Sequence, residues 1–180
     1  KAVIPTINTC LEGGAAVVLM SHLGRPNGEI DPELSLMPVG EELAGLMEMP
    51  IKFSQDCVSN DAIDTSLSLK SGEIHLLENL RFHSGEKKND LTFSSRLARH
   101  GQIYINDAFG TSHREHASNA AILKYYKENK GIGFLFNKEL KYLSTINFSN
   151  SKKHNENNPL GWSESLFIVA LHDINHKFIK

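Results

Sequence analysis

The stretch Ala16-Val17-Val18-Leu19-Met20-Ser21-His22-Leu23-Gly24-Arg25-Pro26 decides the fold, because a short apolar run leads directly into a polar loop. The apolar run 16–20 predicts a buried strand, and the loop then places a histidine, a glycine and an arginine at the carboxyl end of that strand. Open parallel α/β sheets bind their ligands at this end. Because a guanidinium matches phosphate oxygens with two hydrogen bonds, the pattern favours a phosphate ligand. The alternative for this stretch alone is an ordinary surface loop with two basic residues.

Length and composition are typical of a globular domain with no general attraction for polyanions. The 180 residues suit one domain with a small appendage, and 40% hydrophobic and 22% charged residues are ordinary values. A formal net charge of −2 gives no drive toward nucleic acid or anionic membranes, so an anion site must be built locally. Pro5 and Asn8 argue against a signal peptide. We expect Cys10 and Cys57 to be reduced, buried thiols of a cytoplasmic protein.

Apolar periodicity predicts helices and strands in alternation, and hence a Rossmann-like α/β fold with a parallel sheet flanked by helices. The expected helices cover about 4–12, 37–48, 61–69, 91–98 and 133–146, and the expected strands cover 16–20, 51–53, 74–77 and 102–106. Asp90 is the expected N-cap of the fourth helix, and residues 85–90 predict a charged loop before it. Gly131-Ile132-Gly133 is a lone Gly-x-Gly and does not predict a nucleotide site.

Basic residues follow three of the predicted strands. They are His22 and Arg25 after the first strand, Arg81 and His83 after 74–77, and His113, Arg114 and His116 after 102–106. A parallel sheet brings these ends to one edge, which predicts a cationic pocket for a small, highly charged anion. Gly24 and Gly110 are expected to let the backbone approach the ligand.

Two residue groups at the third strand end allow other interpretations. His113 and His116 suit a metal ion, but an arginine lies between them and we predict no metal site. Asp107 is either a general base or, as we expect, a structural residue that orients its basic neighbours.

Three segments together resemble the phosphoglycerate kinase family. They are Ser21-His22-Leu23-Gly24-Arg25-Pro26, Leu76-Leu77-Glu78-Asn79-Leu80-Arg81-Phe82 and Asn106-Asp107-Ala108-Phe109-Gly110-Thr111-Ser112-His113-Arg114, and their order matches as well. Lys138-Glu139-Leu140 is similar to the helix that leads from the family's N-terminal domain toward its hinge. The resemblance covers residues 1–146 and implies an incomplete N-terminal domain of the bacterial type.

The resemblance also implies an activity, which is reversible phosphoryl transfer between ATP and 3-phosphoglycerate, giving 1,3-bisphosphoglycerate and ADP with Mg²⁺. It implies that His22, Leu23, Gly24, Arg25, Arg81 and Arg114 bind 3-phosphoglycerate, with His113, Asp107 and Gly110 in support. The residues that bind Mg²⁺ and ATP in the family are expected to be absent from this chain. We expect a cytoplasmic monomer that binds neither nucleic acid nor membrane.

The family's first strand, with its aspartate and asparagine and the arginine that follows, has no counterpart here, because Lys1 already falls inside the next helix. We therefore expect this chain alone to be an inactive fragment. Residues 147–180 form a divergent tail that we expect to lie outside the core, although 166–171 has the apolar pattern of one more strand.

The tail has a second interpretation, as an out-of-frame translation. Codons CTT GGG TGG AGC GAA AGT CTN encode residues 160–166 and, read one base later, give Leu-Gly-Gly-Ala-Lys-Val, which resembles the family's nucleotide motif Gly-Gly-Ala-Lys-Val-Ser. The alternative is an unrelated natural tail.

Two rival functions also stay open, a non-catalytic module that binds small phosphorylated acids and a polyanion-binding module that uses the same basic residues.

Overall fold

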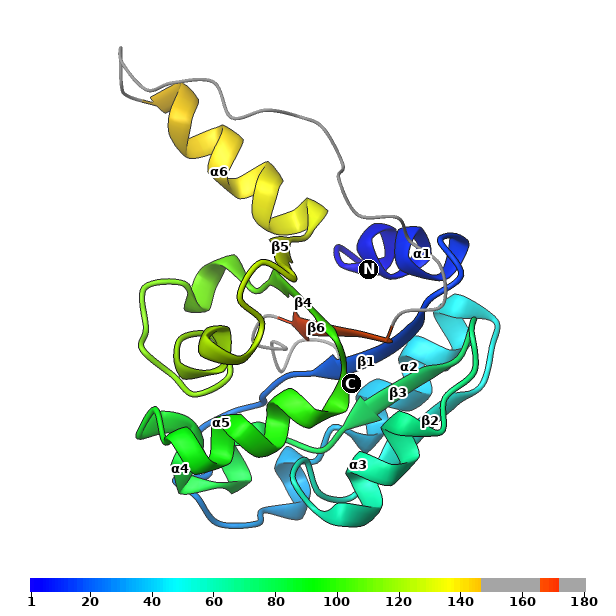
Figure 1. The fold of residues 1–180 in the computed structure, drawn as a ribbon, viewed down its shortest axis with the longest axis vertical. Helices are drawn as coiled ribbons and strands as arrows, with labels where there is room; N and C mark the ends of the chain where they lie inside the picture. The colour runs from blue at the N-terminus through cyan, green and yellow to red at the C-terminus, as the bar shows by residue number, and fades with distance from the viewer. Residues whose placement is uncertain (147–165, 172–180) are drawn as a thin grey trace.

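A six-stranded parallel sheet forms the centre of the molecule, which is known from a computed structural model that describes residues 1–146 and 166–171 (Figure 1). The strand order is β2-β3-β1-β6-β4-β5, and every pairing is parallel. The strands are β1 (Ala16–Met20), β2 (Ile51–Ser54), β3 (Ile74–Leu77), β4 (Ile103–Asp107), β5 (Lys130–Ile132) and β6 (Leu166–Leu171). The predicted α/β fold with a parallel sheet is therefore confirmed.

Helices connect the strands, as the sequence predicts. They are α1 (Ile4–Glu12), α2 (Met37–Met47), α3 (Asn60–Leu67), α4 (Ser84–Lys87), α5 (Leu91–Leu97) and α6 (Phe134–Ile146), with short 3₁₀ turns η1 (Pro32–Leu34), η2 (Leu80–Phe82), η3 (Ala98–His100), η4 (Phe109–Thr111) and η5 (Ala121–Tyr125). Asp90 caps α5 by accepting a hydrogen bond from the Phe93 N–H at 2.7 Å, which confirms the predicted N-cap. Among the described residues, no helix combines the length and apolarity that crossing a bilayer requires.

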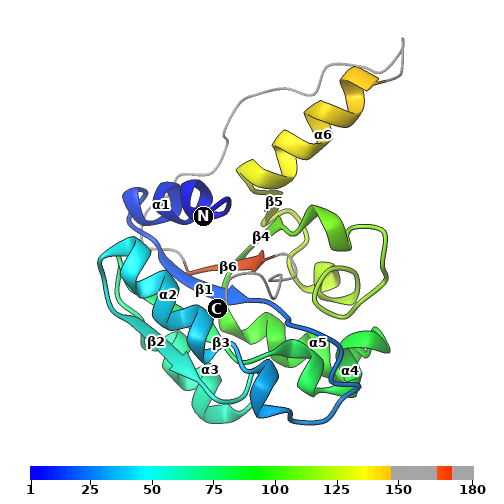
Figure 2. The same ribbon diagram turned by 180° about the vertical axis from the view of Figure 1, so that it is seen from behind.

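Strand β1 is buried on both faces because its side chains alternate between two apolar cores. Val18 and Met20 belong to the core that includes Phe93 of α5, whereas Val17 and Leu19 belong to the core that includes Ile7 of α1. Figures 1 and 2 show α1 and α2 on one side of the sheet and α3 and α5 on the other. This two-sided burial explains why the strand reads as an uninterrupted apolar run.

Strand β6 lies in the middle of the sheet, between β1 and β4. Val17 pairs with Phe167 on one side, and Ile105 pairs with Val169 on the other. The strand predicted at 166–171 is thus present, but the expectation that the tail stays outside the core is wrong for these residues. A strand's place in a sheet depends on pairing between distant segments, which a local apolar run does not reveal. The domain boundary at 147 stays a prediction, and residues 147–165 lie outside the described part.

Two segments differ from the sequence prediction near β4. Residues 84–87 form the single-turn helix α4 within the predicted charged loop, and Glu86 is buried there. Residues 130–132, which include part of the Gly-x-Gly, form β5 at the edge of the sheet. A three-residue edge strand carries too little apolar pattern to be recognised from the sequence.

Candidate functional site

Hydrogen bonds hold together the loops that follow β1 and β3. Two of these bonds join backbone groups, and a third comes from an arginine side chain. The Leu80 N–H donates to the Ser21 carbonyl at 3.1 Å, and the Gly28 N–H donates to the Arg81 carbonyl at 3.1 Å. Arg81 Nη1 then donates to the Gly24 carbonyl at 2.6 Å. Two of the three predicted strand ends therefore meet in space, and the buried Arg81 side chain lies at their junction.

Asn79 fixes the same junction and was not predicted as a site residue. Its Nδ2 donates to the carbonyls of Leu23 at 2.8 Å and Leu34 at 2.9 Å, and its Oδ1 accepts from the Arg81 N–H at 3.0 Å. Asn79 thereby sets the conformation of both loops. The sequence contains Asn79 within the Glu-Asn-Leu-Arg segment, but an uncharged amide gives no signal of an anion site.

Two glycines are required by the shape of the loop after β1. Gly24 has φ +63°, and a Cβ there would lie 2.7 Å from Leu34 Cδ2. Gly28 has φ +91°, and a Cβ there would lie 3.0 Å from the backbone nitrogen of Ser84. Both the left-handed conformation and the close contacts disfavour larger residues. Gly110, which was predicted to serve the same purpose, lies in η4.

The third strand end carries a cluster of cationic groups around His116. His113 and Arg114 are exposed, and Arg114 Nε donates to His113 Nε2 at 3.3 Å. The pKa of His116 is lowered first by burial and then by the nearby cations Arg81, Arg114, Lys87 and His113. Arg81 and Arg114 therefore act on one imidazole, which places the second and third strand ends within electrostatic reach of each other.

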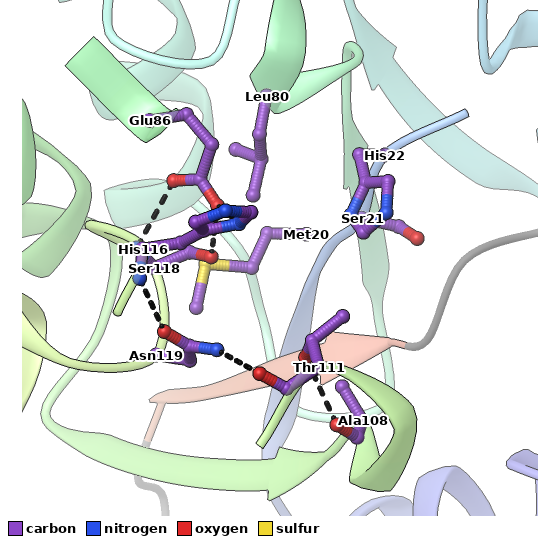
Figure 3. A pocket seen from close by; sticks show the side chains of 10 residues that line it. All are labelled: Met20, Ser21, His22, Leu80, Glu86, Ala108, Thr111, His116, Ser118 and Asn119. Carbon is purple, nitrogen blue, oxygen red and sulfur yellow. Dashed lines mark hydrogen bonds and ion pairs between the residues drawn. The ribbon is translucent and has the colours of Figure 1, made fainter. Parts of the chain in front are cut away.

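Glu86 anchors the loop that bears these cations, and the sequence did not predict this role. Its carboxylate accepts hydrogen bonds from the Ser118 N–H at 3.0 Å and the Ser118 Oγ–H at 2.6 Å (Figure 3). Burial raises the pKa of Glu86, an effect that the bonds from Ser118 and the charge of Arg81 oppose. His116 Nδ1 lies 3.7 Å from Glu86 Oε1. Glu86 thus joins α4 to the segment after Arg114.

A small cavity lies between these groups, with His22 on one side and Glu86 and Asn119 on the other (Figure 3). Its volume is about 10 Å³, which is the space of one water molecule. A three-carbon phosphorylated acid is larger than this cavity. Arg25 is exposed in the loop after β1, and its convergence with Arg81 and Arg114 stays a prediction.

Asp107 lies at the end of β4, where its carboxylate has partners from two helices. It is fully buried, and its carboxylate accepts from Thr6 Oγ1 at 2.7 Å and from the Phe136 N–H at 2.9 Å. It thereby joins α1 and α6 to the end of β4. These hydrogen bonds involve no basic residue, and the expected supporting role of Asp107 beside His113 stays a prediction. Cys10 and Cys57 are buried free thiols, as predicted.

Comparisons with known proteins give one family. The sequence model described as phosphoglycerate kinase matches residues 1–155. The chain is 50% identical over 140 residues to "Phosphoglycerate kinase" of Chlorobium phaeobacteroides (strain BS1), covering 78% of this chain and 35% of that protein. It is 47% identical over 147 residues to "Phosphoglycerate kinase" of Campylobacter curvus (strain 525.92), covering 81% of this chain and 37% of that protein.

Solved structures agree with the sequence matches. The "Structure of phosphoglycerate kinase from Coxiella burnetii" superposes with a TM-score of 0.71 at 33% identity, over 80% of this chain and 35% of the other. The "Crystal structure of Phosphoglycerate Kinase from Pyrococcus horikoshii OT3" gives the same TM-score, 0.71, at 30% identity, over 84% of this chain and 38% of the other. The chain spans about a third of the length of the curated relatives it matches. Since the family model covers most of its residues and the fold agrees, this chain belongs to the phosphoglycerate kinase family.

Proposed function

We propose that this chain supplies the acceptor-binding half of a kinase that transfers a phosphoryl group reversibly between ATP and 3-phosphoglycerate. The observation that carries the proposal is the position of Arg81. Its guanidinium is held by the Gly24 carbonyl at the junction of two loops, and its charge acts on His116 together with that of Arg114. A guanidinium has five N–H donors, so one side chain is able to fix a loop and hold phosphate oxygens.

We assign the following roles to the residues expected at the acceptor site. Arg25, Arg81 and Arg114 hold the phosphate and carboxylate of 3-phosphoglycerate, His22 donates a hydrogen bond, and the backbone at Leu23 and Gly24 shapes the pocket. Phosphoryl transfer depends on positioning and on neutralisation of charge, which is what fixed guanidinium groups provide. His113 adds to the positive potential.

The proposal assigns no nucleotide-binding residue to this chain. ATP with Mg²⁺ supplies the phosphoryl group, but within the described residues Gly131 lies inside the edge strand β5 and Gly133 directly follows it, so the pair does not form a phosphate-binding loop. The 180 residues alone are proposed to bind the acceptor without catalysing transfer, as a cytoplasmic monomer that has neither nucleic acid nor membrane as a partner.

Calorimetric titration of the purified chain tests the proposal. We expect 3-phosphoglycerate to bind at least about tenfold more tightly than glycerate, because charge-assisted hydrogen bonds to the phosphate are lost with glycerate. A coupled ATP-consumption assay should show no turnover above a control without protein. Equal affinity for glycerate, or turnover by the chain alone, would contradict the proposal. Tighter binding of an oligonucleotide with a steep salt dependence would favour the polyanion-binding alternative.

A further inference from the structure

Three potential metal ligands converge in a cluster that the acceptor proposal does not use. Asp56 and Cys57 lie in the loop between β2 and α3, and His83 follows η2. The carboxylate oxygen, the thiol sulfur and the imidazole nitrogen all lie within 4.8 Å of one another. Within the cluster, His83 Nε2 lies 3.3 Å from Asp56 Oδ2. No spacing motif joins these residues, and the sequence therefore predicted no metal site here.

Each of the three groups is held in place by its surroundings. Asp56 Oδ1 accepts from the N–H groups of Val58 at 2.6 Å and Ser59 at 2.8 Å, which aims Oδ2 at His83. The His83 ring packs against Phe93, with ring centroids 5.4 Å apart. The Cys57 carbonyl lies 3.0 Å from the ring nitrogen Nε2 of His100, which fixes the backbone that carries the thiol. Because these contacts already hold the three groups in place, metal binding costs little conformational entropy.

The donor set is that of zinc. Thiolate, imidazole and carboxylate bind Zn²⁺ at about 2.0–2.3 Å in a tetrahedron, so neighbouring ligand atoms in such a site lie roughly 3.3–3.8 Å apart. The separation of 3.3 Å between His83 and Asp56 already falls in this range. Ca²⁺ and Mg²⁺ require oxygen ligands and do not suit a thiol and an imidazole.

Space for a fourth ligand is present beside the cluster. A cavity of about 70 Å³ is lined by the three residues together with Gln55, Asn79 and Phe82, among others. This volume holds a metal ion with a bound water molecule or a small anion. The side chains of His83 and Asp56 are 33% and 40% exposed, so an ion can reach the cluster from solvent although Cys57 is buried.

We propose that Asp56, Cys57 and His83 form a Zn²⁺ site that ties the loop after β2 to the segment that carries Arg81. On binding, the Cys57 S–H bond breaks, its proton passes to the buffer, and a sulfur–zinc bond forms without any change of oxidation state. The thiolate is the form of cysteine that binds a metal, and a thiol with no metal bound keeps its proton at neutral pH. Zinc binding therefore releases about one proton from the thiol.

Cobalt titration tests the site, because Co²⁺ takes tetrahedral zinc sites and absorbs strongly in the near ultraviolet when a thiolate binds it. The full chain, freed of metal with a chelator, is titrated with Co²⁺ and then with Zn²⁺. We expect one Co²⁺ per chain with the thiolate band, and full loss of the band on addition of Zn²⁺. Calorimetry of Zn²⁺ binding in two buffers should report about one proton released per ion.

Variants assign the ligands. Cys57→Ser should remove the thiolate band, and His83→Gln and Asp56→Asn should each weaken Zn²⁺ binding at least about tenfold. Cys10→Ser is the matched control, since Cys10 is a buried free thiol in the other core and its loss should change nothing. His116→Gln is the control for adventitious binding at the cationic loop and should also keep the band.

Several results would overturn the proposal. They are no stoichiometric Co²⁺ or Zn²⁺ binding by the unaltered chain, a thiolate band that persists in Cys57→Ser, or loss of the band in Cys10→Ser or His116→Gln. Circular dichroism confirms that each variant is folded. His83 is partly exposed, so if Cys57→Ser does not fold, undiminished Zn²⁺ binding by His83→Gln contradicts the site on its own.

Discussion

Acidification should destabilise this protein through a buried chain of two neutral histidines. His100 Nε2 lies 3.0 Å from the Cys57 carbonyl, which only accepts, so this nitrogen carries the proton and Nδ1 accepts from Ser66 Oγ at 2.6 Å. Ser66 then accepts from His75 Nδ1 at 2.8 Å, and His75 Nε2 accepts from Ser54 Oγ at 2.8 Å. Both imidazoles are fully buried, and a further proton on either one would break this order.

The size of this loss of stability follows from the pKa values of the two histidines. Burial lowers the pKa of His75 and of His100 from 6.5 to about 4. Between these pH values the unfolded chain binds more protons than the folded one, so stability is complete above pH 6.5 and falls as the pH falls toward 4. A shift from 6.5 to about 4 corresponds to about 3 kcal/mol for each histidine, and the two values are coupled, so they do not simply add.

Urea unfolding between pH 7 and pH 4.5 measures this effect. We expect His100→Gln to be less stable than the unaltered protein at pH 7. The difference in the free energy of unfolding between the two proteins should narrow by about 2 kcal/mol at pH 4.5, because the variant lacks one of the titrating groups. His113→Gln is the control, since His113 is exposed, and its curve should run parallel to that of the unaltered protein. If His100→Gln also runs parallel over this range, the reasoning from buried neutral imidazoles is refuted.

Three further changes test the framework of the site. Ser118→Ala removes the 2.6 Å bond to Glu86 and should lower the free energy of unfolding by about 1.5–3 kcal/mol in urea, whereas no change would exclude Glu86 as the anchor. Gly28→Ala forces a Cβ to within 3.0 Å of the Ser84 nitrogen at φ +91° and should cost more than about 1 kcal/mol, measured by thermal unfolding; a neutral result would show that the loop adapts. Removal of residues 147–180 takes β6 from between β1 and β4 and should lower the urea midpoint sharply, and an unchanged midpoint would contradict a central β6.

The sequence predicted the elements whose own residues determine them. The run at 16–20 is apolar throughout because β1 packs on both faces, and Asp90 caps α5 through a bond within four residues of chain. The basic strand ends were also correctly placed after β1, β3 and β4, because each follows a recognisable apolar run.

Features that depend on distant partners were not predicted. Glu86 lies in a run of charged residues whose sequence predicts a solvated loop. Its hydrogen-bond partner Ser118 is distant in sequence and contacts it only in the folded structure. Asp107 was assigned to the cations beside it in sequence, but its hydrogen bonds go to Thr6 and Phe136. The place of β6 between β1 and β4 likewise depends on pairing between strands far apart in the chain.

The central claim is that separate strand ends act on one phosphate, and titration of arginine variants with 3-phosphoglycerate tests it most directly. Arg81→Lys and Arg114→Lys should each weaken binding at least about tenfold, because an ammonium does not reproduce the bidentate geometry. Arg99→Lys is the matched control, since Arg99 is exposed in η3, away from these loops, and its affinity should be unchanged. Unchanged affinity in both Arg81→Lys and Arg114→Lys, with the fold intact by circular dichroism, would contradict the claim that these strand ends share one ligand.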